Sequence, residues 1–179
     1  MITFYEWLNL LNELQTEKIL YIMRGVPGSG KSTEAFRLAG GDESKIFSVD
    51  DYFGRGAEYK IPEKIIYLRD ARKWNYARVQ EAAKQGITPI IADETHLKAS
   101  LAKPYSEIAK LYGYKTDIRE PQSDWWQQIS PLLQDKETND ATLKQWSTTL
   151  GQKNLHGVKP ESIYKMFQDY KPYSVNDLT

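Results

Sequence analysis

Short apolar runs alternate along the first two thirds of the chain with longer segments whose apolar residues recur at helical spacing. The run at 18–24 is mostly apolar, rich in β-favouring residues and followed by glycine, which is typical of a buried parallel strand. Similar runs lie at 46–49 and 87–92, and a weaker one lies at 114–119. Helix-like stretches occupy 31–39, 62–85 and 98–112. This alternation predicts βαβ units around a parallel sheet, where ligands bind at the carboxyl ends of the strands.

The two ends of the chain have a different pattern. Thr3 and Glu6 form a capping-box sequence, and the apolar residues of 4–14 predict an amphipathic N-terminal helix. After Pro121 the chain turns polar and predicts helices near 124–135, 138–150 and 160–170. We expect this last third to cover the sheet rather than to join it. The prediction is one domain over 1–179, comprising an N-terminal helix at 1–17, core βαβ units at 18–120, and a helical lid with the C-terminal region at 121–179.

The composition excludes several kinds of chemistry. The 179 residues include 40% hydrophobic and 27% charged residues, the balance of a soluble globular domain. The absence of cysteine excludes disulfides and thiolate catalysis, and two histidines make a zinc centre a poor expectation. Basic and acidic residues number 24 each, so no global positive field favours nucleic acid or anionic membrane. Without a long apolar run or a basic secretory leader, we expect a cytoplasmic protein that does not enter membranes.

A glycine-rich motif directly follows the first predicted strand. The sequence GVPGSGKS at 25–32 fits G-x-x-x-x-G-K-[S/T] and precedes a predicted helix, which is the context of a phosphate-binding loop. Its backbone N–H groups would surround the phosphates, Lys31 would reach the β- and γ-phosphates, and Ser32 would ligate Mg²⁺. The expected nucleotide-binding residues are Gly25, Pro27, Gly28, Ser29, Gly30, Lys31, Ser32 and Thr33. The motif predicts a three-layer α/β/α P-loop NTPase fold that binds ATP and Mg²⁺.

Acidic residues follow the next two predicted strands. Asp50 and Asp51 stand after 46–49, where a carboxylate would face the γ-phosphate and accept the proton of an attacking hydroxyl. Asp93 ends the third run like a Walker-B acid and would hold Mg²⁺ together with Ser32. The alternative for each aspartate is a cap on the following turn or helix. Glu94 and His96 come next and could contact the acceptor, although a loop histidine more often has no chemical role.

Taken together, these motifs resemble the polynucleotide 5′-hydroxyl kinase branch of the P-loop kinases. The resemblance rests on RGVPGSGKST at 24–33, VDDYF at 49–53 and IIADET at 90–95. Further residues are similar to the kinase-like domain of ubiquitin-ligase-binding proteins: WN at 74–75, KPY at 103–105, REP at 119–121, WW at 125–126 and NLHGV at 154–158. Phage polynucleotide kinase and zeta-toxin kinases are the wider relatives. The resemblance covers 19–126 and 151–170.

The resemblance implies transfer of the ATP γ-phosphoryl group to the 5′-hydroxyl of a polynucleotide. It makes Asp51 the catalytic base, with Asp50 as its supporting neighbour and Lys31 on the transferring phosphate. A helical lid would bring Lys153, His156 and Lys159 over the phosphates. Because no arginine lies between 120 and 179, a lysine or histidine would have to replace the bidentate guanidinium of the lid. Relatives usually carry asparagines at 94 and 96, so the acceptor is left open.

Several features bear on that acceptor. A basic cluster in and before the second helix could follow a nucleic-acid backbone or form a solvated charged face: Lys60, Lys64, Arg69, Arg72, Lys73 and Arg78. Trp125, Trp126 and Tyr112 could stack on a base or belong to the core. The segment 127–150 could be a specialised lid, a protein-partner surface or an insertion. Two other functions stay open, a small-molecule kinase for a nucleoside, sugar or sugar nucleotide, and a nucleotide-binding adaptor without transferase activity.

Overall fold

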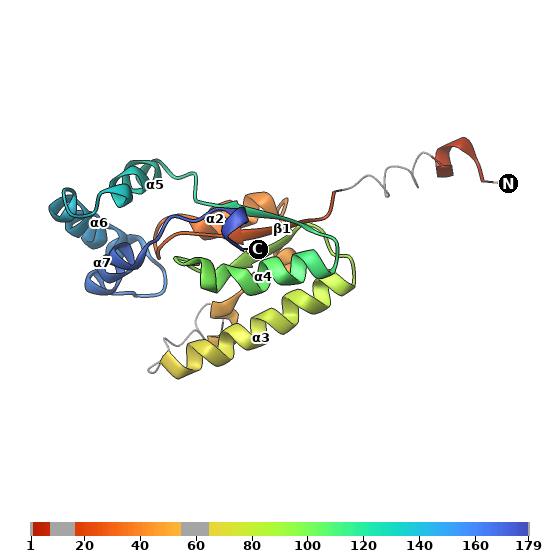
Figure 1. Ribbon diagram of the computed structural model, residues 1–179, viewed down its shortest axis with the longest axis horizontal. Coiled ribbons are helices and arrows are strands. Elements are labelled where there is room, and N and C mark those ends of the chain that lie inside the picture. Colours follow the sequence, from red (N-terminus) through yellow and green to blue (C-terminus); the bar gives the residue numbers. More distant parts are fainter. Residues whose placement is uncertain (1, 8–16, 55–64, 179) are drawn as a thin grey trace.

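A parallel four-stranded sheet organises the chain. The computed structural model describes residues 2–7, 17–54 and 65–178. The strands are β1 (Ile19–Met23), β2 (Ile46–Ser48), β3 (Ile90–Asp93) and β4 (Lys115–Arg119), in the order β2-β3-β1-β4 (Figure 1). In the register, Ile22 is paired with Ala92 on one side and with Ile118 on the other, and Ser48 is paired with Asp93. The predicted parallel sheet is confirmed.

Helices cover both faces of this sheet and give three layers. Helix α2 (Lys31–Leu38) packs on one face, where Met23 and Ile91 meet Ala35. Helices α3 (Ile65–Lys84) and α4 (Ala99–Leu111) pack on the other, where Leu20 and Ile22 are fully buried. Successive residues of a strand point to opposite faces, so the near-continuous apolar runs serve both cores.

One strand boundary differs from the prediction. The run at 87–92 forms a strand only from Ile90 onward and extends to Asp93. Pro89 has no N–H group to give to a ladder, so pairing starts after it. Thr88 instead accepts a hydrogen bond from the Ile19 N–H at 3.2 Å through its side-chain hydroxyl. Asp93 is therefore the last residue of the strand, beside Ser48 of β2.

The C-terminal third forms a helical unit at the carboxyl ends of the strands. It comprises α5 (Asp124–Ile129), η4 (Ser130–Gln134), α6 (Asp140–Lys153) and α7 (Pro160–Asp169). These helices have a core of their own, which Val26 and Leu97 join from the loops after β1 and β3. Figure 1 shows α5, α6 and α7 grouped beside one end of the sheet. As expected, the described part of this third adds no strand to the sheet. Its closing turn η5 (Val175–Leu178) packs on α4 and β4, whereas α5, α6 and α7 pack mainly on one another and on the two loops.

A buried arginine ties the end of the chain to the first strand. Arg24 follows β1, is 4% exposed, and lies between the rings of Tyr170 and Tyr173 at 4.1 and 4.4 Å. Its guanidinium donates to the carbonyls of Lys171 (2.7 Å) and Tyr173 (3.2 Å). Because an arginine this deeply buried needs such partners, the segment after α7 is fixed against the start of the phosphate loop.

At the N-terminus, residues 4–7 are helical and the predicted capping box is confirmed. The Thr3 N–H donates to the Glu6 carboxylate at 2.7 Å, and the Glu6 N–H donates to the Thr3 hydroxyl at 3.2 Å. The rest of the predicted N-terminal helix lies outside the described residues. Within the described ranges, no helix combines the length and the apolar character needed to cross a membrane.

Candidate functional site

The loop after β1 has the conformation that its glycines allow. Gly25, Gly28 and Gly30 all have positive φ values, of 147°, 77° and 98°. Gly30 stands directly before α2, so the first N–H groups of that helix open toward the loop. The Lys31 ammonium reaches back over the loop and donates to the Val26 carbonyl at 3.1 Å. The predicted strand–loop–helix context is confirmed.

Residues of α5 hold this loop from outside. The Ser123 hydroxyl donates to the Ser29 carbonyl at 2.7 Å, and the Trp125 indole N–H donates to the Gly28 carbonyl at 3.0 Å. Two loop carbonyls therefore point outward to fixed donors, which favours a concave inner side lined by N–H groups. The motif gives no signal for these two residues, which lie 94 and 97 positions further along the chain.

The acidic pair lies on a short 3-10 turn, η2 (Val49–Phe53), immediately after β2. The Ser48 hydroxyl caps this turn by accepting from the Asp50 N–H at 3.2 Å. Burial raises the pKa of Asp50, while the positive fields of His156 and Lys31 act in the opposite direction. The capping role that was the alternative for the aspartates thus belongs to Ser48.

Asp93 is the most unusual carboxylate of the site. Its Oδ1 atom is buried and has no hydrogen-bond partner. Burial raises the pKa of Asp93 to about 6. The positive charge of Lys31 lowers this pKa, and the negative charge of Asp50 raises it. Burial also lowers the pKa of Lys31, which the nearby Asp93 and Asp50 partly offset. A buried carboxylate oxygen without a partner needs a cation or a donor, and Asp93 lies where the motif expects magnesium.

The residues fit Mg²⁺ in the manner of P-loop proteins. No group of three or more His, Asp or Glu side chains suited to a metal ion occurs within the described ranges. Mg²⁺ bound with a nucleotide needs no such cage, because phosphate oxygens and water fill most of its coordination positions. The orphaned oxygen of Asp93 and the hydroxyl of Ser32 are the groups that would hold it.

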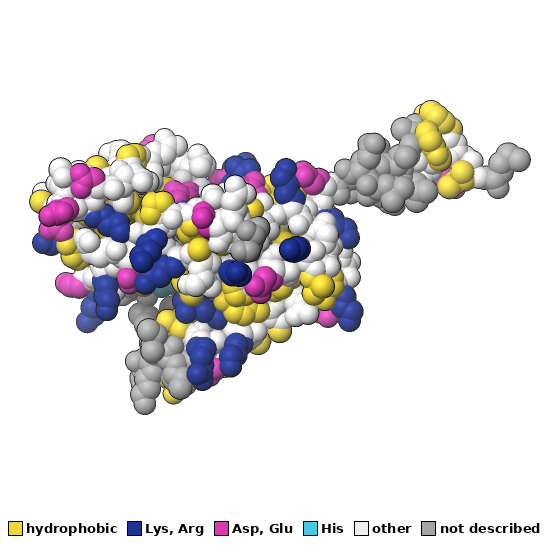
Figure 2. All heavy atoms as spheres, viewed as in Figure 1, with side chains coloured by type: hydrophobic (Ala, Val, Ile, Leu, Met, Phe, Trp, Pro, Cys, Tyr) yellow, Lys and Arg dark blue, Asp and Glu magenta, His cyan; other side chains and the backbone are white. Residues whose placement is uncertain are grey.

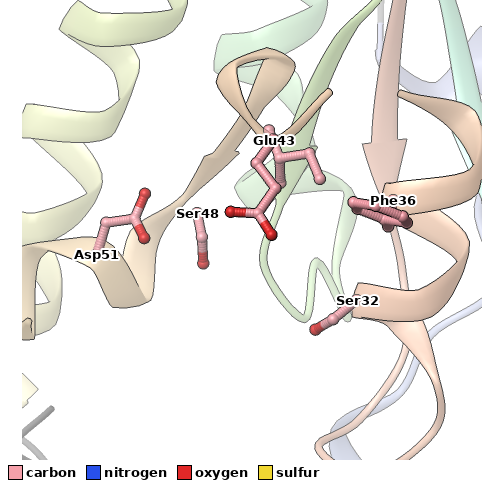
Figure 3. Close-up of a pocket in the computed structure, with 6 residues that line it drawn as sticks. Ser32, Phe36, Glu43, Ser48 and Asp51 are labelled. Carbon is pink, nitrogen blue, oxygen red and sulfur yellow. The ribbon is translucent and has the colours of Figure 1, made fainter. Parts of the chain in front are cut away.

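Asp51 lines a cavity beside α2. Its carboxylate accepts from the Arg78 guanidinium at 3.1 Å. The cavity has a volume of about 250 Å³ and is lined by Ser32, Phe36, Glu43, Ile46, Ser48 and Asp51. Figure 3 shows the Asp51, Ser48 and Glu43 side chains on one side of this space and Phe36 and Ser32 of α2 on the other. The candidate base and the candidate metal ligand Ser32 therefore face one space.

The three basic residues expected from the lid have different surroundings. His156 Nε2 lies 3.7 Å from the Asp50 Oδ2 atom, so the connection between α6 and α7 reaches the acidic pair. The Lys153 ammonium lies 4.5 Å from the centre of the Trp125 ring, beside the phosphate loop. Lys159 is exposed directly before α7. The structure therefore brings His156 to the acidic pair and Lys153 to the outer side of the loop.

A second cavity, of about 300 Å³, lies at the start of α2. Its lining combines loop and helix residues with the segment before α5: Gly30, Thr33, Glu34, Gln122, Ser123, Asp124 and Trp125. The indole of Trp125 gives it an aromatic wall. Because it adjoins Gly30 and Thr33, this cavity is placed to take the nucleoside part of a nucleotide whose phosphates lie in the loop.

Two residues expected near the acceptor are engaged elsewhere. Glu94 forms a short ion pair with Arg72 of α3, with the Arg72 Nε 2.7 Å from Oε1. His96 is fully buried, its Nδ1 atom lies 2.6 Å from the Met23 carbonyl, and burial lowers its pKa. His96 is therefore part of the core, in agreement with the alternative that a loop histidine has no chemical role.

The aromatic and basic residues that were candidates for contact with the acceptor also differ in their surroundings. Trp126 is 1% exposed and donates to Glu120 at 2.9 Å, so it is a core residue. Tyr112 ends α4, at the edge of the sheet opposite the phosphate loop, and packs on the core. In the basic cluster, Arg72 and Arg78 turn inward to Glu94 and Asp51, while Arg69 and Lys73 are exposed. Lys60 and Lys64 lie outside the described residues.

The fold and the loop define a P-loop nucleotide-binding domain, and comparison with known proteins gives its family. The model of the AAA domain family matches residues 20–151, so the chain belongs to that family. Among curated proteins it is 36% identical over 156 residues to NEDD4-binding protein 2 of Homo sapiens, a match that covers 87% of this chain and 8% of that protein.

Two other curated proteins match the chain at lower identity. The chain is 31% identical over 119 residues to 2′,3′-cyclic-nucleotide 3′-phosphodiesterase of Pongo abelii, covering 63% of this chain and 26% of that protein. It is 25% identical over 177 residues to YLP motif-containing protein 1 of Homo sapiens, covering 86% of this chain and 7% of that protein. The chain thus spans a small part of the length of each of these curated relatives.

Proposed function

We propose that the protein transfers the γ-phosphoryl group of ATP to a hydroxyl, and that the acceptor is the 5′-hydroxyl of a polynucleotide. The observation that carries the proposal is the convergence of Lys31, Ser32, Asp50, Asp51 and Asp93 at the carboxyl ends of three adjacent strands. Phosphoryl transfer needs positioned phosphates, a metal and a group that accepts the hydroxyl proton, and these residues supply each part.

Each residue of the site has a distinct task in this proposal. The loop and Lys31 hold the phosphates, and Asp93 with Ser32 would hold Mg²⁺, whose charge opposes the charge that develops on the transferring group. Asp51 accepts the proton of the acceptor hydroxyl in the cavity that it shares with Ser32. Arg78 orients the Asp51 carboxylate, and His156 extends from the lid to Asp50.

The relatives support a nucleotide-related enzyme and leave the acceptor to experiment. The name of one relative describes a phosphodiesterase acting on 2′,3′-cyclic nucleotides, and that of another describes binding to NEDD4. The segment 127–150, the proposed surface for a protein partner, uses Ile129, Leu133, Leu143 and Leu150 for its own core. A partner at this segment would therefore meet its polar face.

The test is transfer of labelled phosphate from Mg-ATP to 5′-hydroxyl RNA and DNA oligonucleotides, nucleosides and sugar nucleotides. Asp51→Asn should lower transfer by at least about 100-fold, the scale of a lost general base, while ATP affinity stays within a few-fold. Asp50→Asn is the matched variant, and we expect it to retain more activity. Label on a small molecule alone would establish the small-molecule kinase. ATP binding without transfer to any acceptor would favour the adaptor.

A further inference from the structure

Three aromatic side chains cluster beside Asp51 and take no part in the steps described so far. Tyr52 and Phe53 follow Asp51 on η2, and their ring centres lie 5.3 Å apart at an interplanar angle of 81°. Trp74 approaches from α3, with its ring centre 5.6 Å from that of Tyr52 at 67°. Tyr52 is 44% exposed, although burying such a ring would be favourable. We name these three residues the aromatic cluster.

Arg78 connects the aromatic cluster to the candidate base. Its guanidinium lies 4.2 Å from the centre of the Trp74 ring and donates to the Asp51 carboxylate at 3.1 Å. It also donates to the Asn75 side chain at 3.2 Å, which fixes it on α3. A group that rests on the aromatic cluster therefore lies next to the residue that would deprotonate the acceptor.

The surroundings of the aromatic cluster indicate what that group is. Tyr67, Trp74 and Arg78 are spaced by seven and four residues, which places them on one face of α3. Tyr67 is 46% exposed, whereas the exposed Arg69 and Lys73 lie on another face of α3, because residues one and five positions before Trp74 do not share its face. Figure 2 shows basic side chains over this part of α3. An exposed aromatic ring beside an arginine suits the terminal base of a single-stranded polynucleotide, because bases stack on aromatic rings and the guanidinium adds cation–π contacts.

We propose that the aromatic cluster is a stacking platform for the 5′-terminal base of a single-stranded acceptor. The proposal rests on the proposed function, since it places the terminal hydroxyl at Asp51. It adds a binding site of its own and specifies a polynucleotide acceptor with an unpaired terminal base. A small sugar would not use the terminal-base contact.

Direct binding tests the platform separately from catalysis. The probes are two short single-stranded oligonucleotides with a fluorophore at the 3′ end, identical except that one has an abasic residue at its 5′ end. Fluorescence anisotropy with the intact chain should give about 5- to 100-fold weaker binding for the abasic probe, the range of one stacked base. Tyr52→Ala should weaken binding of the ordinary probe by a similar factor and leave the abasic probe almost unaffected.

The variants separate stacking from general loss of structure. Tyr52→Phe keeps the ring and should restore the preference for the ordinary probe. Tyr5→Ala removes a tyrosine that is 79% exposed and outside the site, and should change nothing.

Equal affinity of the unaltered chain for the two probes would overturn the platform, as would an equal loss for both probes in Tyr52→Ala. The transfer assay on the same oligonucleotides tells the two proposals apart. Base-dependent binding without phosphoryl transfer would support the platform and contradict the kinase. Transfer that is indifferent to the terminal base would support the kinase and contradict the platform.

Discussion

Gly28 is a residue at which the phosphate loop lies close to the helical unit. A Cβ atom at this position would lie 2.7 Å from the Leu150 carbonyl oxygen, at the end of α6. Its φ of +77° is also unfavourable for any residue with a side chain. The glycine thus serves the loop conformation and the attachment of α6 to that loop.

We predict that Gly28→Ala destabilises the protein by about 2–4 kcal/mol, from the left-handed backbone and the forced displacement of α6. Gly40→Ala is the matched control, because Gly40 has a φ of +65° and an added Cβ would meet nothing within 4 Å. The control should lose only about 1 kcal/mol, the backbone part. Urea unfolding of the two variants measures both losses of stability. Equal losses would show that the close contact between position 28 and α6 does not affect stability.

Some residues of the site could be predicted from the local sequence, and others could not. Asp50 and Asp93 stand at or next to strand ends, and parallel topology brings such ends to one edge. Lys31 belongs to the phosphate-loop motif after β1, so local pattern places all three residues. Arg78 lies in the middle of a long helix, and only the packing of α3 on η2 brings it to Asp51. The burial of His96 could not be predicted from the sequence, because it depends on Met23 and Tyr105, which belong to other elements.

At the scale of elements, the connection between α6 and α7 depends on one side chain. The Asn154 amide donates to the carbonyls of Leu150, Gly151 and Val158 at 3.1, 2.8 and 3.0 Å. Its oxygen accepts from the Val158 N–H at 2.7 Å. Asn154 thereby closes the turn that carries His156 to Asp50.

Asn154→Ala should cost about 1–3 kcal/mol of stability, because it leaves backbone groups of the turn without partners. We expect it also to release His156 from Asp50 and so to lower phosphoryl transfer more than ATP affinity. Gln152→Ala, an exposed position of the same helix, should change neither property. Thermal unfolding and the transfer assay are the measurements. Unaltered transfer by Asn154→Ala would show that this turn has no role in phosphoryl transfer.

The hydrophobic period along the sequence predicts where the helices and strands lie, but a proline decides where two of them begin or end. The helix predicted over 124–135 is α5 up to Ile129 and then the 3-10 turn η4, which has Pro131 in its first turn. Pro131 lacks the N–H group that would continue the α-helical bonds. The third strand begins after Pro89 for the same reason.

At the scale of the whole molecule, the phosphate loop joins two hydrophobic cores. Leu20 and Ile22 of β1 belong to the core of the sheet, and Val26 of the following loop belongs to the core of the helical unit. The segment after α7 returns over Arg24 and ends with Leu178 against α4 and β4. These contacts join residues far apart in the chain, so hydrophobic period alone could not locate the helical unit.

Because both cores meet at the loop, we predict that Mg-ATP stabilises the two as one unit. Calorimetry should show one unfolding transition, and ATP with Mg²⁺ at 100 times its Kd should add about 2.7 kcal/mol to the stability. EDTA should reduce the gain, and Lys31→Ala should remove most of it. In Asp93→Asn the stabilisation by ATP should become almost independent of Mg²⁺, because the replaced carboxylate carries the unpartnered oxygen. Two separate transitions, with only the sheet responding to nucleotide, would show that Val26 and Arg24 do not couple the helical unit to the site.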